Sequence, residues 1–149
     1  MRRTSEFSLI VCVAMAVLLG TRGGPTAQTP AAVYTAPQAA AGKAHYATTC
    51  AACHGADLGG ADAPALAGVD FAKAWSTQTT ADLFKYVQGM PPGSTPLPDG
   101  DNLTVVAFIL QQNGAAAGTT PLEPTTAVTI GAIATGTRPP IAAAVSHRR

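Results

Sequence analysis

Cys50-Ala51-Ala52-Cys53-His54 is the stretch of this sequence that decides its fold. In a helix, residues three apart lie on the same side, so Cys50 and Cys53 can reach two vinyl groups of one porphyrin. The imidazole of His54, one residue further on, can then point at the iron. This C-x-x-C-H pattern is typical of covalent haem attachment. We therefore expect one haem c, bound through both cysteines.

Three other kinds of site use paired cysteines. A structural zinc site needs two further Cys or His ligands, and only His45 and His147 remain besides Cys12, which lies in the apolar run expected to be removed with an export signal. A thioredoxin-like redox pair would require a βαβ pattern, which the sequence lacks. A disulfide between the two cysteines is compatible with export but leaves His54 unexplained.

The N-terminus is typical of an export signal. Arg2 and Arg3 precede an unbroken apolar run of eleven residues at positions 9–19. Signal peptides have apolar regions of roughly 7–15 residues, whereas a spanning helix needs roughly 20. We expect cleavage after Ala27, which leaves no stable membrane span. The alternative is an uncleaved signal that anchors the chain in the membrane.

The charge of the chain excludes nucleic acid as a partner. Without residues 1–27 it carries six basic and seven acidic residues, a net charge of about −1. In the part expected to fold, three lysines oppose six aspartates. Such a surface is unlike the basic face of a nucleic-acid-binding protein.

The chain divides into four expected segments. Residues 1–27 are the signal, 28–35 a linker, 36–117 the folded domain, and 118–149 a tail rich in Ala, Thr and Pro. We expect the tail to be largely disordered. The alternative is that part of it packs on the domain as an extended strap. A domain this small buries proportionally little surface, so a haem at its centre would complete the core.

Helical signals occur at four places in the domain. Helices are expected over residues 39–50 and 70–75, from Thr80 to just before Gly89, and from Asp101 to Gly114. The last of these is rich in Val and Ile, so a strand is an alternative there. Glycines indicate a loop over residues 55–69, and four prolines exclude a helix interior from residues 90–100.

Met90 is the expected second iron ligand. The other methionines, Met1 and Met15, lie in the expected signal. Two prolines follow Met90 and restrict the backbone, so its thioether can be held against the iron. A thioether raises the redox potential relative to a second histidine. The alternative is that Met90 is a hydrophobic side chain of the loop. His45 shares a helix with the haem cysteines and is interpreted as a surface residue.

Together these residues resemble the single-haem class I cytochrome c family, and most of all the cytochrome c modules that accompany bacterial quinoprotein dehydrogenases. The resemblance covers residues 36–117. The family has a glycine and an aromatic residue eight and four positions before the first haem cysteine, which are Gly42 and Tyr46 here. In the family these meet an aromatic and an aliphatic residue on the last helix, here Phe108 and Val105.

The resemblance also implies roles for two residues outside the attachment motif. Pro64 matches a loop proline whose carbonyl accepts a hydrogen bond from the ligand histidine, a contact that orients the ring and tunes the metal. Trp75 matches an indole that some members direct at a haem propionate, and the alternative is a tryptophan of the core. Asn102 departs from the pattern, since several related modules have a tyrosine there.

The resemblance implies an all-α fold with three main helices around one covalently bound haem. It also implies a bacterial periplasmic setting, low-spin iron held by His54 and Met90, and electron transfer rather than catalysis of bond chemistry. Expected partners are redox proteins, such as a quinoprotein dehydrogenase as donor and an oxidase or another cytochrome as acceptor. Two alternatives stay open: a permanent electron-transfer subunit of a dehydrogenase or oxidase complex, and a haem sensor or enzyme that binds ligands.

Overall fold

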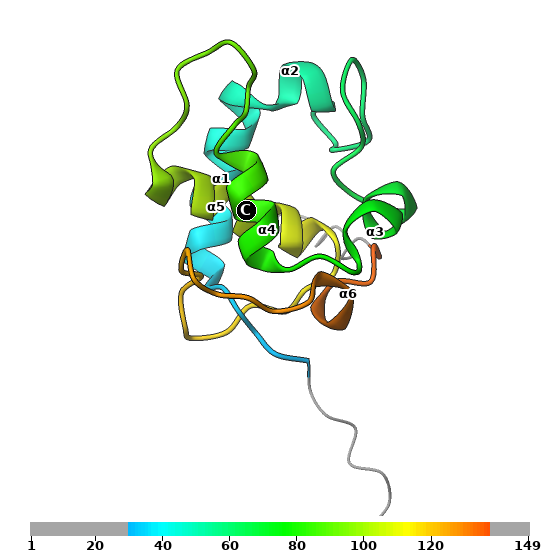
Figure 1. The fold of residues 1–149 in the computed structure, drawn as a ribbon, viewed down its shortest axis with the longest axis vertical. Helices are drawn as coiled ribbons and strands as arrows, with labels where there is room; N and C mark the ends of the chain where they lie inside the picture. Colours follow the sequence, from blue (N-terminus) through cyan, green and yellow to red (C-terminus); the bar gives the residue numbers. More distant parts are fainter. Residues whose placement is uncertain (1–29, 138–149) are drawn as a thin grey trace, which may run out of the picture.

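The architecture is helical throughout the part of the chain that the computed structural model describes, residues 30–137 (Figure 1). The helices there are α1 (Ala36–Thr49), α2 (Ala51–His54), α3 (Val69–Trp75), α4 (Thr80–Val87), α5 (Asp99–Gln112) and α6 (Ile130–Ile133). The expected all-α class is confirmed, and the strand alternative for α5 is not adopted. The expected signal at residues 1–27 lies outside the described residues.

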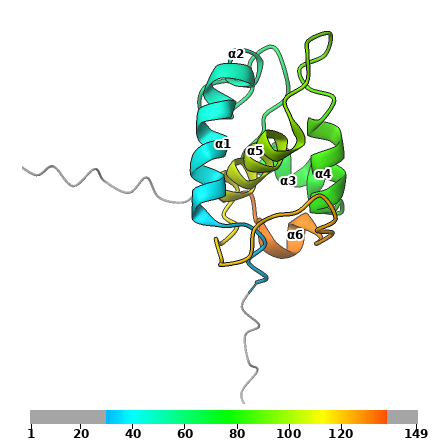
Figure 2. The same cartoon turned by 90° about the vertical axis from the view of Figure 1, so that its left-hand side faces the viewer.

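The crossing of α1 and α5 forms the centre of the fold (Figure 2). Gly42 allows the two backbones to approach, because a Cβ at this position would overlap the Thr104 carbonyl. One turn further on, the ring of Tyr46 packs against Phe108 with their centroids 5.4 Å apart. The expected contact of Gly42 and Tyr46 with the last helix is therefore confirmed.

Capping residues determine where α1 and α4 begin. Thr35 and Gln38 bond to each other's backbone N–H groups at the start of α1, as Thr79 and Asp82 do at the start of α4. The cap of α4 is therefore Thr79 rather than the expected Thr80. Thr80 is the first residue of the helix, and its buried hydroxyl donates to Thr126 O.

The expected linker packs on the domain where it is described. Tyr34 is 1% exposed, and its hydroxyl donates to Ala115 O at 2.6 Å. Burial raises the pKa of this phenol, which therefore stays neutral and able to donate. Residues 30–35 are thus part of the folded unit, because a single large aromatic side chain anchors them.

Residues 118–137, which we call the strap, also pack on the domain instead of forming a disordered tail. Leu122, Ile130 and Ile133 are buried. Backbone hydrogen bonds fasten the strap: Gly118 N donates to Tyr34 O at 2.8 Å, and Ile130 N to Gln78 O at 2.9 Å. The strap alternative therefore holds for these residues, and residues 138–149 lie outside the described part.

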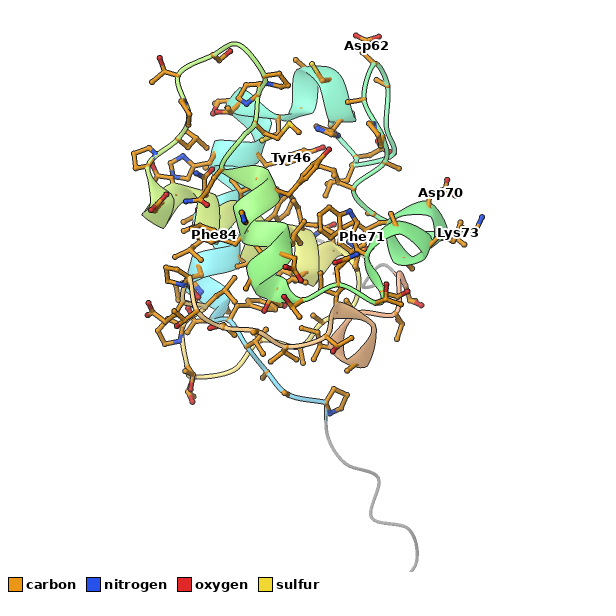
Figure 3. All side chains as sticks on the ribbon, in the orientation of Figure 1. Tyr46, Asp62, Asp70, Phe71, Lys73 and Phe84 are labelled. Carbon is orange, nitrogen blue, oxygen red and sulfur yellow. The ribbon has the colours of Figure 1, made fainter. Side chains whose placement is uncertain are left out.

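The aromatic side chains labelled in Figure 3 lie in the interior, and the labelled charged side chains lie at the surface. Tyr46 and Phe71 are buried, whereas Asp70 and Lys73 form an exposed ion pair with an N–O distance of 3.5 Å. None of the helices within residues 30–137 is long and apolar enough to cross a membrane.

Candidate haem site

A cavity of about 690 Å³ is enclosed by α2, α3, α4, α5 and the loop of residues 55–68. Its volume lies within the roughly 300–1,000 Å³ of small-molecule and cofactor sites. The six residues expected from the sequence all line it: Cys50, Cys53, His54, Pro64, Trp75 and Met90. The structure therefore brings the expected site residues together around one cavity.

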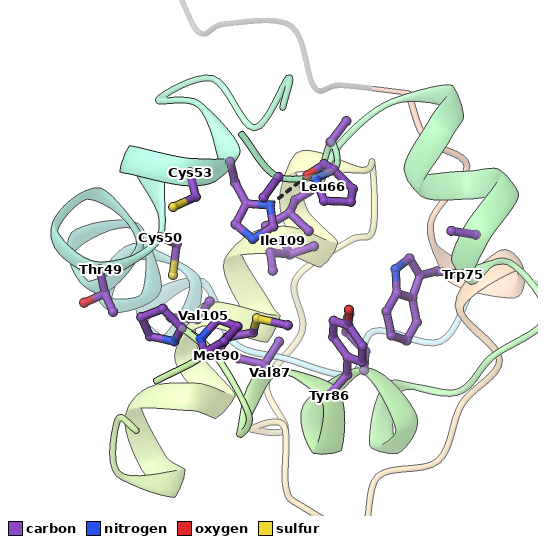
Figure 4. A pocket seen from close by; sticks show the side chains of 18 of the residues that line it. Thr49, Cys50, Cys53, Leu66, Trp75, Tyr86, Val87, Met90, Val105 and Ile109 are labelled. Atoms are coloured by element: carbon purple, nitrogen blue, oxygen red, sulfur yellow. Dashed lines mark hydrogen bonds between the residues drawn. The ribbon is translucent and has the colours of Figure 1, made fainter. Parts of the chain in front are cut away.

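The two cysteines lie on the same side of the cavity (Figure 4). Cys50 joins α1 to α2: its N–H donates to Tyr46 O at 2.9 Å, and its carbonyl accepts from His54 N at 3.0 Å. This short turn of helix places both thiols and the imidazole along one wall. Burial raises the pKa of the Cys50 thiol, so it is held in the protonated form.

The imidazole of His54 is oriented by one hydrogen bond, drawn as the dashed line in Figure 4. His54 Nδ1 lies 2.7 Å from Pro64 O. A carbonyl oxygen only accepts, so Nδ1 carries the proton. The lone pair of Nε2 is then free to bind a metal. The contact that the resemblance implied for Pro64 is present in the structure.

Met90 follows directly from α4. Leu83, Val87 and Met90 are spaced i, i+4, i+7, and all three line the cavity. Met90 N donates to Val87 O at 2.9 Å, which continues the turn of the helix. The sulfur of Met90 lies inside the cavity (Figure 4). We call residues 88–98 the methionine loop.

Two side-chain hydrogen bonds hold the base of the methionine loop. Gln88 Nε2 donates to Asp99 Oδ1 at 2.7 Å, which joins the two ends of the loop. Asn102 Nδ2 donates to Leu97 O at 2.9 Å. Asn102, which departs from the pattern that the resemblance implied, is therefore buried against this loop.

Aromatic side chains form the wall opposite the cysteines (Figure 4). Trp75 packs between Phe71 and Tyr86, with ring centroids 6.3 and 5.4 Å away. Phe71 is buried, whereas Tyr86 is 57% exposed. Trp75 is thus shared between the core and the cavity.

Several apolar residues of the cavity wall were not expected there from the sequence. Leu83, Val87 and Tyr86 come from α4, and Val105 and Ile109 from α5. The signal for them is their spacing: each set repeats at three or four residues, so it lies on one face of its helix.

The donor set and the walls fit a haem. The cavity combines apolar walls for a porphyrin, two thiols three residues apart, an imidazole with a free Nε2 and a thioether. The zinc alternative lacks ligands, because no group of three or more His, Cys, Asp or Glu side chains within residues 30–137 could hold a metal ion.

Residues 37–109 match the family model described as cytochrome C oxidase, cbb3-type, subunit III. The chain is also similar to one in the crystal structure of the sulfane dehydrogenase SoxCD from Paracoccus pantotrophus. That likeness has 25% identity and a TM-score of 0.44, and covers 83% of this chain and 68% of the other. None of the curated proteins compared with the chain matches it. The residues that match the family model include the whole lining of the cavity.

Proposed function

We propose that this chain, which is a mono-haem c-type cytochrome module, carries single electrons between redox proteins. The observation that carries the proposal is the convergence of Cys50, Cys53, His54 and Met90 on one cavity. Haem-based electron transfer follows from the family match, and the residue roles below are our proposal.

The cysteines would hold the haem covalently. The two thiols would be bonded to the two vinyl groups of the porphyrin as thioethers, an attachment that needs no oxidant because each S–H would be added whole to a double bond. The protonated Cys50 thiol and the neighbouring Cys53 supply these two additions. Covalent attachment keeps the cofactor with a protein that works outside the cytoplasm.

His54 and Met90 would be the two protein ligands that hold the iron. When bound, the haem supplies a one-electron Fe(III)/Fe(II) couple. Pro64 O fixes the His54 ring so that Nε2 faces the cavity. Met90 would supply a soft thioether to the iron, which would disfavour the binding of small molecules and favour the ferrous state. These roles support electron transfer without catalysis of bond chemistry.

We further propose that the protein works in the periplasm. Residues 1–27 have the pattern of an export signal. The partners would be redox proteins that approach the haem, such as a dehydrogenase donor and an oxidase or cytochrome acceptor. Trp75 and the exposed Tyr86 form the aromatic wall on the side of the cavity opposite the cysteines.

The test is to export the full chain from a host with haem-maturation machinery. A denaturing gel stained for haem detects covalent attachment, and spectra of both oxidation states report the axial ligands. We expect covalent haem, narrow low-spin bands and the weak red band of a methionine–ferric bond. Rapid and complete binding of carbon monoxide to the ferrous protein at neutral pH would instead indicate an open iron and a sensor or enzyme.

A further inference from the structure

We propose that Asn113 is a positioning residue for His54, acting through the loop that carries Pro64. The proposal rests on the proposed function, because it concerns the electronic properties of the iron ligand. Asn113 lies at the C-terminal cap of α5, and it is 0% exposed. It does not line the cavity, so any effect on the haem must pass through other residues.

The side chain of Asn113 joins α5 to two points of the loop. Its Nδ2 donates to Leu66 O at 2.9 Å, and its Oδ1 accepts from Gly68 N at 3.0 Å. A further bond from Nδ2 to Ile109 O, 2.8 Å long, fixes the amide against its own helix. The amide therefore uses both donor and acceptor groups, and its orientation is fully determined.

The loop passes this restraint to His54 over a short distance. Leu66 is two residues from Pro64, whose carbonyl accepts the His54 Nδ1 proton. Leu66 N also donates to Leu58 O at 2.9 Å, and the Leu58 side chain is 2% exposed. Leu66, two residues after the Pro64 carbonyl, is therefore fixed through its N–H by Leu58 and through its carbonyl by Asn113.

The end of the strap seals Asn113 from solvent. Gly136 N donates to Asn113 O at 3.1 Å. A Cβ at Gly136 would lie 2.9 Å from Gly68 O, so the strap approaches the loop more closely than another residue allows. Hydrogen bonds that are shielded from water in this way are stronger than exposed ones. The strap thus protects the contacts that hold the loop of residues 55–68, which we call the histidine loop.

Loss of the Asn113 contacts should change the electron donation of the His54 imidazole as well as the stability of the folded protein. A firm hydrogen bond from Nδ1 to a carbonyl makes the imidazole a better electron donor, which stabilises ferric iron. A looser loop weakens that bond, so the redox potential should rise. The Nδ1 proton should also exchange faster with solvent, by about tenfold if one or two hydrogen bonds of ordinary strength are lost.

The experiment compares Asn113→Leu and the milder Asn113→Ser with the control Thr80→Val, each as the full haem-loaded chain. Thr80 is also buried, and its hydroxyl bonds Thr126 O and Val128 N of the strap. Its substitution therefore removes buried side-chain contacts without touching the histidine loop. For each protein we would measure exchange of the His54 ring proton by NMR in the ferrous state, the midpoint potential and the denaturant midpoint.

Both Asn113 variants should show faster ring-proton exchange and a higher potential, and Thr80→Val should show only a lower denaturant midpoint. If Asn113→Leu fails to fold, Asn113→Ser decides the outcome. Unchanged exchange and potential in the Asn113 variants would overturn the proposal, as would equal changes in Thr80→Val. If the unaltered protein carries no covalent haem, the proposed function fails, a result that is seen before any variant is made.

Discussion

The two proposed iron ligands come from segments that are fastened in different ways. The loop after His54 is tied into the interior by Leu58 and Asn113, both buried. The methionine loop is exposed over most of its length and is held at its base by the Gln88–Asp99 contact and by Asn102. The loop beside His54 is therefore bonded to two buried residues, whereas Met90 lies in a loop that is exposed over most of its length and bonded to one buried residue, Asn102.

This difference indicates which ligand would leave the iron first. Local opening begins where few buried contacts hold the backbone. The methionine loop meets that description, whereas the histidine loop buries the side chain of Leu58 and is bonded to the buried Asn113. We expect heat, denaturant or a strong external ligand to displace Met90 while His54 stays bound.

The largest effect should come from removing Cys50 and Cys53, the two cysteines proposed to attach the haem next to His54. In Cys50→Ala combined with Cys53→Ala, no thiol is left to bond a vinyl group, so covalent haem should be lost. The cavity would lose the group that fills it, and the chain should be poorly folded. A haem-stained denaturing gel and circular dichroism measure the two effects. The matched control is Cys50→Ala alone, which should keep one thioether; covalent haem in the double variant would contradict the assignment.

Removal of Met90 should have a smaller and more local effect. In Met90→Ala the haem should stay attached, because the histidine side is untouched. The red methionine–ferric band should vanish, the potential should fall, and carbon monoxide should bind the ferrous protein. Ser94→Ala, an exposed change in the same loop, serves as the control. An unaltered spectrum and potential in Met90→Ala would remove Met90 from the iron.

Much of the fold could be predicted from the sequence because its signals are local. The threonine at the start of α4, the glycine-rich loop and the prolines after Met90 act within a few positions of themselves, although the α4 cap was expected one residue too late and α1 begins three residues before its expected start. The α5 segment was ambiguous, because its Val and Ile residues suit a strand as well as a buried helix. Packing against α1 decides in favour of the helix.

The strap and Asn113 could not be predicted in the same way. Leu122 is an isolated apolar residue, and Ile130 and Ile133 lie in an apolar run too short to predict a helix, so low complexity suggested disorder. Asn113, just before Gly114, has the pattern of an ordinary helix end. Its contacts join positions more than forty residues apart. Of the site, the presence of Cys50, Cys53, His54 and Met90 around one cavity was predictable from the motif and from the prolines after Met90, whereas the contacts of Asn113 and the strap were not.

A change at the base of the methionine loop should affect Met90 without affecting the attachment of the haem beside His54. Gln88→Ala removes the bond to Asp99, which should weaken the loop by about 1 kcal/mol or less, because the contact is exposed. The red band should then disappear at a lower temperature than in the unaltered protein, while haem remains attached. Gln112→Ala, at the other end of α5, is the control. Equal melting of the band in both variants would show that the contact does not hold Met90.

The smallest effect should be a dependence on pH at the start of α4, the helix that leads to Met90. Thr79 donates to Asp82 from its backbone N–H at 2.9 Å and from its hydroxyl at 2.6 Å. These bonds hold the pKa of Asp82 below its ordinary value of 3.8. Since the folded pKa is lowered, the contribution to stability is present above that ordinary value and is lost as the pH falls through the folded value.

Asp82→Asn tests this contribution without changing the shape of the cap. The variant should be less stable than the unaltered protein at about pH 7, and the difference should shrink toward about pH 2, as the carboxyl takes up a proton. Because Asp82 is exposed, added salt should also reduce the difference. Urea unfolding at both pH values measures it, with Asp57→Asn as an exposed control outside α4. If the difference in stability between the two proteins is equal at both pH values, the charge of Asp82 does not stabilise α4.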